Sequence, residues 1–328
     1  MPTNLPPDYF EVEKRYRAAE TTAEKIAVLE ELMGTIPKHK GTDHLRADLR
    51  RKLAKLKSSA QAKKGASRQD PAFQIEKEGV GQVAVVGPTN VGKSALVTAL
   101  TNASPEVAES PHTTWTPVPG MMLFENVQIQ LIDTPALDRE FVEPALLALV
   151  RRADLVLLVV DVHTDPMQQL ESTVALLEVH RIVPSHRQDR YVEPERLTII
   201  PFIVLGNKCD DGNCDEDFEI FCGLLEEAWP VLPVSAQTGR NLERLKQQVF
   251  RQLGIIRVIS KAPGKAPEFG SPFTMKAGGT VGEFARKIHR DFFDNLKSAR
   301  VWGSAEFDGQ LVGREYVLHD GDVVELRT

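Results

Sequence analysis

From about residue 80 onward, short apolar runs rich in β-branched residues alternate with segments of helical periodicity. The runs are "QVAVVG", "VQIQLIDTP", "LVLLVVDV", "TIIPFIVLGNK" and "VLPVSA". Strands that helices cover on both faces read as continuous apolar runs, so this alternation predicts an α/β fold with a doubly wound sheet. Ligands of such sheets bind at the carboxyl ends of the strands, and the loops at those ends are where a functional site is expected.

The loop after the first run fits the phosphate-binding pattern G-x-x-x-x-G-K-[ST], as "GPTNVGKS" from Gly87 to Ser94. Its glycines let backbone N–H groups turn inward around a β-phosphate, and the following helix adds positive potential at its N-terminus. Lys93 is expected to neutralise the β and γ oxygens, and Ser94 to ligate Mg²⁺. The expected phosphate-binding residues are Gly87, Pro88, Thr89, Asn90, Val91, Gly92, Lys93, Ser94 and Ala95.

A second motif, "NKCD", follows the fourth run and predicts the choice of base. Asp210 can accept hydrogen bonds from the N1–H and 2-amino groups of guanine, a donor pair that adenine lacks. Asn207 and Lys208 are expected to brace the loop and cover the base. The segment "SAQ", which is Ser235, Ala236 and Gln237, is expected to close the pocket with the backbone N–H of Ala236.

Between these motifs lie two candidate switch segments, at 111 to 120 and at 133 to 142. Asp133 of "DTPA" stands where an aspartate would hold Mg²⁺ through water, although an Asp-x-Pro turn alone would also explain this loop. In "PHTTWTP", Thr114 is our choice for the residue that reaches Mg²⁺ and the γ-phosphate, with Thr113 second. Lys93, Thr114 and Asp133 are therefore the expected catalytic residues, with Ser94, Thr114 and Asp133 as metal ligands.

The flanking regions predict two further units. Residues 1 to 78 are expected to form a helical hairpin and a linker, with a capping box at Thr21 and Glu24, and residues 79 to 255 the nucleotide-binding domain. Residues 256 to 328 are expected to form a small β-grasp-like domain. Its helix begins at a second capping box, Thr280 and Glu283, and is followed by the strand candidates "ARVWG", "GQLVG" and "DVVELR".

Composition limits the classes of partner. The net charge is −6, but residues 38 to 68 are strongly basic, which fits either an RNA contact or a solvated helix face. The longest apolar runs are of strand length and the N-terminus lacks a signal-like segment, so we expect a cytoplasmic protein without a membrane contact. The three cysteines, Cys209, Cys214 and Cys222, are expected to be reduced thiols rather than zinc ligands or a disulfide framework.

Taken together, these residues resemble the Obg-type GTPases, and in particular the developmentally regulated GTP-binding (DRG) proteins. The resemblance rests on "KLAKLK", the nucleotide motifs, "TTWTPVPG", "KIHRDFFDNLKSARVWG" and "LHDGDVVEL", the last two of which resemble the TGS domain of that family. It implies a slow GTPase that works with ribosomes or other RNA-containing assemblies, through the basic N-terminal region and the TGS domain.

Two departures from the family bear on this expectation. The family usually has a glycine at position 136 and a glycine-rich stretch after it, where this chain reads "ALDREFVEP". The domain that the family inserts within its nucleotide-binding domain is reduced here to "RIVPSHRQDRYVEPER", residues 181 to 196. The first departure concerns switch motion and the second the choice of partner.

Hydrolysis needs a means other than a glutamine, because Leu137 stands in the position where many GTPases have one. Phosphoryl transfer depends mainly on positioning and charge neutralisation, so Mg²⁺ and a second cation could supply most of it. Asn90 is a candidate ligand for K⁺, or alternatively a brace for the first switch, and Arg139 is either an arginine finger in cis or a solvated side chain. We expect weak intrinsic turnover. The alternatives are a nucleotide-gated binding module with negligible hydrolysis and, less favoured, an RNA-binding scaffold.

Overall fold

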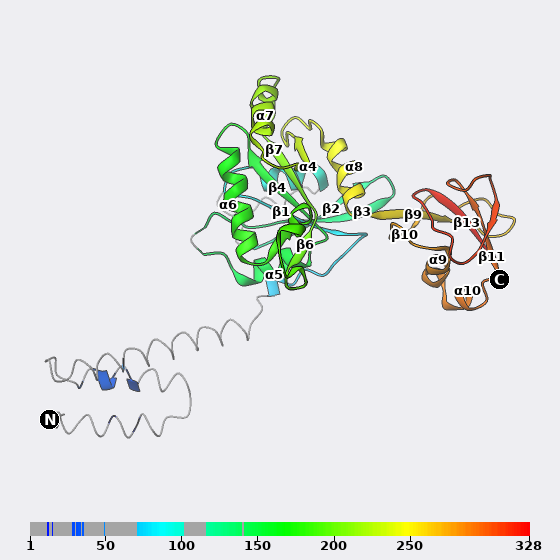
Figure 1. Cartoon of the computed structure of the whole chain (residues 1–328), viewed down its shortest axis with the longest axis horizontal. Coiled ribbons are helices and arrows are strands. Elements are labelled where there is room, and N and C mark those ends of the chain that lie inside the picture. The colour runs from blue at the N-terminus through cyan, green and yellow to red at the C-terminus, as the bar shows by residue number, and fades with distance from the viewer. Residues whose placement is uncertain are drawn as a thin grey trace. The chain divides into compact units, whose positions relative to one another are not determined.

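The structure is a computed structural model of the chain, and it describes residues 71–101, 116–139 and 141–328 together with isolated positions between 12 and 49 (Figure 1). The chain divides into two compact units, Met1–Pro71 and Ala72–Thr328. In the first unit, Leu29 and Leu32, which lie in the region expected to be helical, are helical and buried. The capping box at Thr21 and Glu24 and nearly all of the basic stretch lie outside the described residues.

A short 3₁₀ turn, η1 (Pro71–Phe73), lies at the boundary between the units, and the second unit contains a six-stranded mixed sheet in the order β2-β3-β1-β4-β7-β8. Its strands are β1 (Gln82–Val86), β2 (Val118–Phe124), β3 (Val127–Asp133), β4 (Leu155–Asp161), β7 (Phe202–Asn207) and β8 (Val231–Pro233). All neighbours are parallel except β2 and β3, which form an antiparallel hairpin. The expected α/β sheet is confirmed. Strand β2 is an addition that the sequence reasoning did not anticipate; it is an edge strand whose first residues are exposed and contain Pro119 and Gly120.

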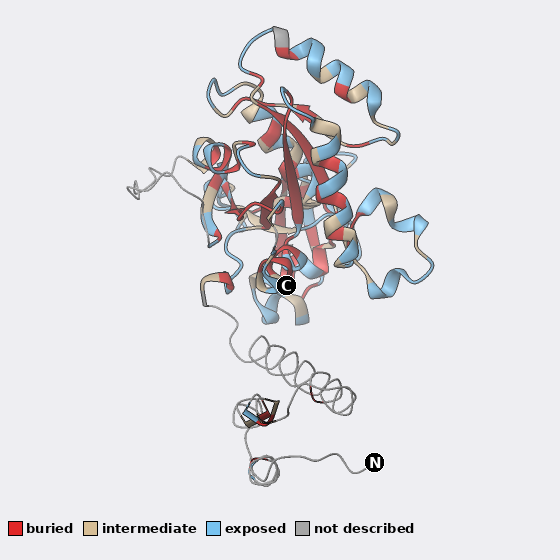
Figure 2. Ribbon diagram, turned by 90° about the vertical axis from the view of Figure 1, so that its left-hand side faces the viewer, coloured by how far each residue is buried: buried red, intermediate tan, exposed pale blue. Residues whose placement is uncertain are grey.

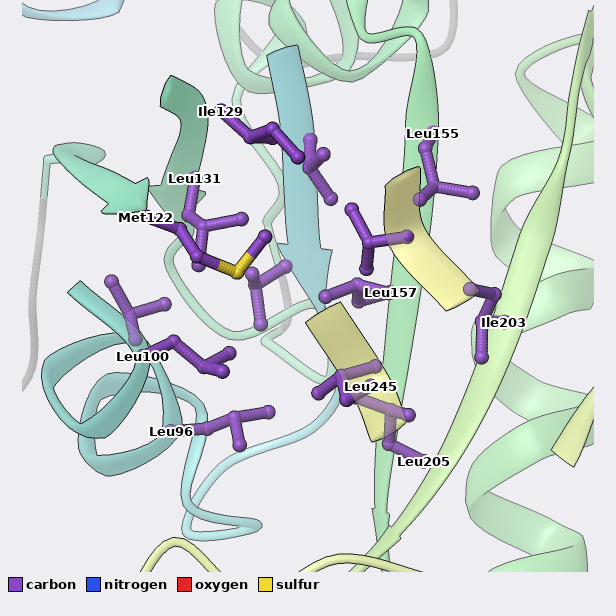
Figure 3. Packing of buried hydrophobic residues seen from close by; sticks show 14 of the residues in the cluster. Leu96, Leu100, Met122, Ile129, Leu131, Leu155, Leu157, Ile203, Leu205 and Leu245 are labelled. Atoms are coloured by element: carbon purple, nitrogen blue, oxygen red, sulfur yellow. The ribbon is translucent and has the colours of Figure 1, made fainter. Parts of the chain in front are cut away.

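Helices cover both faces of this sheet. They are α4 (Lys93–Thr101), α5 (Pro144–Arg152), α6 (Pro166–Val179), α7 (Asn213–Leu224) and α8 (Leu242–Gln252). On one face, Leu96 and Leu100 of α4 and Leu245 of α8 pack against strand residues such as Leu131 and Leu157 (Figure 3). On the other face, apolar residues of α5, α6 and α7 pack against the alternate residues of the same strands. The central strands are buried and the outer faces of the helices are exposed (Figure 2).

The segment expected to be a reduced insertion, residues 181 to 196, contains β5 (Ile182–Pro184) and the 3₁₀ turns η2 (Ser185–Arg190) and η3 (Pro194–Arg196). Strand β5 pairs in parallel with β6 (Thr198–Ile200), so the run "TIIPFIVLGNK" is two strands, β6 and β7, in different sheets. Arg187 fixes this segment. Its guanidinium donates two hydrogen bonds of 3.0 Å to the carboxylate of Glu227 and one of 2.8 Å to Glu178. It also lies 5.0 Å from the ring centre of Trp229. Such bidentate, charge-assisted contacts hold the segment against the domain.

The C-terminal residues form a five-stranded sheet in the order β10-β9-β13-β11-β12. Its strands are β9 (Ile255–Ser260), β10 (Phe273–Lys276), β11 (Ser298–Trp302), β12 (Gln310–Val312) and β13 (Asp322–Arg327), with the helices α9 (Val281–Ile288) and α10 (Arg290–Asp294). The capping box is confirmed, since Thr280 Oγ1 accepts from Glu283 N and Glu283 accepts from Thr280 N. The three strand candidates are also confirmed, whereas β9 and β10 were not anticipated.

One side chain connects this sheet to the tip of the β2–β3 hairpin. Arg257 of β9 donates to both carboxylate oxygens of Asp320, at 3.0 and 2.7 Å, and its guanidinium also pairs with Glu125 in the hairpin turn. The hydrogen bond to Asp320 is the main reason that the pKa of Arg257 is raised above its usual range. The same guanidinium lies 5.0 Å from the ring centre of Phe250 in α8. The hairpin turn is thereby tied to the first strand of the C-terminal sheet.

The cysteine expectation is wrong for one pair. Cys209 and Cys214 are joined as a disulfide, and both are buried. The chain turns back from the end of β7 into α7, which brings the two Cα atoms to 5.1 Å, within the range that a disulfide spans. Cys222 is a free thiol. Among the described residues, no helix combines the length and the apolar character needed to cross a membrane.

Candidate nucleotide site

The phosphate loop between β1 and α4 has a backbone that requires its glycines. Gly87 and Gly92 have φ of +148° and +90°, and Asn90 has φ of +63°. A Cβ atom on Gly92 would lie 2.4 Å from the side-chain nitrogen of Asn207, and one on Gly87 would lie 2.3 Å from the carbonyl oxygen of Val159. The loop is thus packed closely on the strand ends, and at Gly87 and Gly92 a side chain would be disfavoured by both the positive φ and the steric clash.

A cavity of about 310 Å³ opens over this loop. One side is lined by Thr89, Asn90, Gly92, Lys93, Ser94 and Ala95, and the other by Thr134, Pro135, Ala136 and Arg139. The cavity therefore lies between the phosphate loop and the second candidate switch, at the carboxyl ends of β1 and β3, where the sequence predicts the triphosphate.

Lys93 is almost fully buried at the floor of the loop. Only 8% of it is exposed, and its Nζ donates to the carbonyl oxygens of Gly87 at 3.0 Å and Pro88 at 2.6 Å. Burial lowers the pKa of Lys93 from 10.5 to about 8, against the opposing effect of the Asp133 carboxylate. An ammonium group in such a position gains strongly from a phosphate anion.

Ser94 and Asp133 form a pair suited to a magnesium ion. The Ser94 hydroxyl donates to Asp133 Oδ2 at 2.5 Å, while Asp133 Oδ1 is buried and receives no hydrogen bond from any described residue. Burial raises the pKa of Asp133. An unpaired buried carboxylate oxygen is costly, and a hydrated divalent cation beside Ser94 would satisfy it. The third expected ligand, Thr114, and its alternative Thr113 lie outside the described residues.

Asn207 connects the phosphate loop to the guanine motif. Its side-chain amide donates to the carbonyl oxygen of Val91 at 2.8 Å and accepts from the backbone N–H of Ala236 at 3.3 Å. The Asp210 carboxylate accepts a 2.5 Å hydrogen bond from the hydroxyl of Ser235, a buried residue. The three segments predicted to surround a guanine nucleotide therefore meet at the ends of β1, β7 and β8. Gln237 is exposed in the turn that follows.

Two contacts of the site were missed by the sequence reasoning. Lys208 Nζ is held at 2.7 Å by Asp161 Oδ2, at the end of β4. An acidic residue directly after the run "LVLLVV" was the signal for this contact. Asp138 accepts from the backbone N–H and the hydroxyl of Thr89, at 3.0 and 2.8 Å, and so joins the second switch to the phosphate loop. No local pattern indicated that contact.

A phosphate loop, a serine and aspartate pair suited to magnesium, and a guanine motif on a mixed α/β sheet define a GTP-binding protein of the P-loop class. Comparison with known families agrees. The family described as "50S ribosome-binding GTPase" matches residues 82–187, and the TGS domain family matches residues 256–328.

Similar proteins cover nearly the whole chain. "Uncharacterized GTP-binding protein MJ1326" of Methanocaldococcus jannaschii is 32% identical, over 92% of each chain. "Developmentally-regulated GTP-binding protein 1" of Xenopus laevis and "Ribosome-interacting GTPase 1" of Saccharomyces cerevisiae are each 26% identical, over 93% of this chain and 98% and 99% of theirs. The YchF GTPase of Schizosaccharomyces pombe has the same fold, with a TM-score of 0.53 at 14% identity over 77% of this chain and 99% of that one. The chain belongs to the DRG-like group of Obg-type GTPases with a C-terminal TGS domain.

Proposed function

We propose that this protein is a magnesium-dependent GTP hydrolase that turns over slowly alone and acts as a switch on ribosomes or another RNA-containing assembly in the cytoplasm. The observation that carries the proposal is the position of Asn207, which hydrogen-bonds both the phosphate loop and the loop that follows β8. One residue thereby sets the distance between the phosphate end and the base end of a nucleotide.

In this proposal the chain's own groups divide the work. Lys93 leaves the carbonyl oxygens of Gly87 and Pro88 for the β and γ oxygens, while the N–H groups of the loop hold the β-phosphate. Ser94 and Asp133, the latter through water, hold Mg²⁺, which supplies charge neutralisation on the phosphates when bound. Asp210, already oriented by Ser235, accepts the two N–H donors of guanine.

Base selection has a direct test. Asp210→Asn should weaken GTP and GDP binding by at least about tenfold and allow xanthine nucleotides, whose 2-carbonyl can accept from the new amide. Titrations with fluorescent nucleotides give both affinities. Unchanged affinity for GDP would remove Asp210 from base recognition.

Hydrolysis is tested by steady-state phosphate release with and without Mg²⁺ and ribosomes. We expect slow release that requires Mg²⁺, is faster with ribosomes, and is reduced sharply in Lys93→Ala. Parallel assays in K⁺ and Na⁺ test Asn90, which lines the cavity and which we propose as a K⁺ ligand; equal rates in both salts would favour its alternative role as a brace.

The alternative is a nucleotide-gated binding module in which GTP occupancy sets the conformation and hydrolysis is negligible. Absence of phosphate release under every condition would favour it. Co-sedimentation with ribosomal subunits in the GDP state and with a non-hydrolysable GTP analogue tests the partner under both proposals. The Saccharomyces cerevisiae relative named for ribosome interaction supports that choice of partner.

A further inference from the structure

The start of the second candidate switch is held by three contacts with strand β1, the phosphate loop and the apolar core. The Thr134 hydroxyl donates to the carbonyl oxygen of Val85 at 2.7 Å, and the Leu137 N–H donates to the carbonyl oxygen of Gly87 at 3.2 Å. The Leu137 side chain is only 3% exposed and packs in the apolar core under α5. The backbone path from Thr134 to Leu137 is thus set by the body of the domain.

This path turns Leu137 away from the cavity, so the position that often carries a water-orienting glutamine faces the core. The next residue, Asp138, uses both carboxylate oxygens to accept from Thr89 of the phosphate loop. These hydrogen bonds outweigh the effect of burial and lower the pKa of Asp138, so it remains an anion. The switch segment is thereby fixed to β1 at Thr134 and to the phosphate loop at Leu137 and Asp138.

Arg139 follows directly and lines the same cavity as Lys93 and Ser94. The positive charge of Arg139 lowers the pKa of Lys93, and the negative charge of Asp138 raises it. Both charges therefore act on the ammonium group that we propose binds the phosphates. A guanidinium beside the phosphate cavity can donate two hydrogen bonds to phosphoryl oxygens, and it keeps its charge at every relevant pH.

We infer that Arg139 is a catalytic residue that acts in cis, donating from its guanidinium to the γ-phosphoryl oxygens as negative charge redistributes in the transition state. Asp138 is its positioning residue, through Thr89. The inference deepens the proposed GTP hydrolysis and rests on it. Because the buried Leu137 cannot hydrogen-bond water or phosphate, Arg139 is the switch residue assigned to stabilise the transition state.

The test compares Arg139→Ala with a matched control, Arg151→Ala. The control substitution removes the same charge. Arg151 and Arg139 both line a groove beside α5, and Arg151 donates to the carbonyl oxygen of His180 at 2.8 Å. In single-turnover hydrolysis we expect Arg139→Ala to be about 100-fold slower and the control to be within about threefold of the wild type. The affinity for GDP should change less than about threefold in both, because a contact made in the transition state does not hold GDP.

Two readouts separate a catalytic from a structural role. Free guanidinium ions at millimolar concentration should restore part of the rate of Arg139→Ala and leave the control unchanged. Binding of GDP with aluminium fluoride, which imitates the transferring phosphoryl group, should be lost in Arg139→Ala and kept in the control. Asp138→Ala should slow hydrolysis by about tenfold, and a further Arg139→Ala substitution in that variant should then cost less than it does in the wild type.

The outcomes of these experiments distinguish a failure of the role of Arg139 from a failure of the proposed GTPase function. If the wild type hydrolyses GTP and the rate of Arg139→Ala is within about threefold of the wild-type rate, the role of Arg139 is overturned and the GTPase proposal remains intact. If the wild type releases no phosphate, aluminium fluoride binding decides: dependence on Arg139 supports the inference, and independence overturns it. A wild type that neither hydrolyses GTP nor binds the analogue overturns both.

Discussion

Burial of Lys93 makes nucleotide binding depend on pH in a way that can be calculated. In the nucleotide-free protein its pKa is about 8, since its ammonium group is removed from water and, among the described residues, donates to the carbonyl oxygens of Gly87 and Pro88. A bound diphosphate should return the pKa to 10 or above. Each protein molecule in which Lys93 is neutral must then take up a proton on Lys93 when it binds the diphosphate. From the pKa of about 8, uptake is about 0.1 proton at pH 7, about 0.5 at pH 8 and about 0.8 to 0.9 at pH 9.

The same linkage predicts that GDP affinity falls about tenfold between pH 7 and pH 9, close to one pKa unit or 1.4 kcal/mol. Isothermal titration calorimetry at each pH, in buffers with different ionisation enthalpies, measures the uptake directly. GDP avoids interference from hydrolysis, and titrations in EDTA exclude protons linked to a metal ion. Lys93→Arg is the matched control, because a guanidinium does not titrate in this range and should bind GDP without uptake.

Proton uptake below about 0.1 at pH 9 would refute the lowered pKa of Lys93, and equal uptake in Lys93→Arg would assign the proton to another group. A second consequence concerns folding. Because folding lowers the pKa of Lys93 from 10.5 to about 8, the unfolded chain binds more protons between these values. The contribution of Lys93 to the stability of the nucleotide-free protein therefore increases as the pH rises through that window.

Three further substitutions have defined outcomes. Gly92→Ala places a Cβ 2.4 Å from the amide of Asn207 at a φ of +90°, and should lower the free energy of unfolding by about 2 kcal/mol and abolish tight GDP binding; an unchanged melting temperature would contradict this. Leu137→Gln buries an amide at a site that is 3% exposed, and should cost about 2 kcal/mol in urea unfolding without raising kcat; faster hydrolysis would show that this side chain reaches the cavity. Arg187→Met removes two hydrogen bonds from Glu227 and should cost about 2 kcal/mol at neutral pH. Since the arginine contacts outweigh burial and lower the pKa of Glu227 from 4.5, the difference between Arg187→Met and the wild type should shrink as the pH falls below that value, and a constant difference would refute the assignment.

The parts of this structure that could be predicted from the sequence are those specified by neighbouring residues. The phosphate loop follows from glycine spacing between a strand and a helix, and the capping box at Thr280 and Glu283 needs residues three positions apart. The doubly wound sheet follows from apolar runs that remain continuous because both faces of each strand are covered. In each case the local pattern alone was sufficient.

The contacts that assemble the site are of another kind. Asn207 reaches Val91 across 116 positions, and Asp138 reaches Thr89 across 49. Such pairs depend on which strand ends become neighbours, and nothing in the flanking residues encodes that. Strand β2 escaped prediction for a related reason, because its alternate residues face solvent and its pairing with β3 alone makes it a strand. The pairing of Cys209 with Cys214 likewise required knowledge of the turn between them.

The β2–β3 hairpin has its two ends in different surroundings. At one end, Val118 is paired with Asp133, next to the candidate nucleotide site. At the other end, Phe124 is paired with Val127, beside the turn in which Glu125 pairs with Arg257. Seven consecutive pairs form a stiff ribbon about 20 Å long, and a ribbon of this kind slides against its neighbour only in steps of two residues if its buried face is to remain buried. If nucleotide exchange displaces the end of the hairpin at Asp133, we expect the paired strands to move together and to carry the displacement to the turn at Glu125, which pairs with Arg257 at the start of the C-terminal sheet.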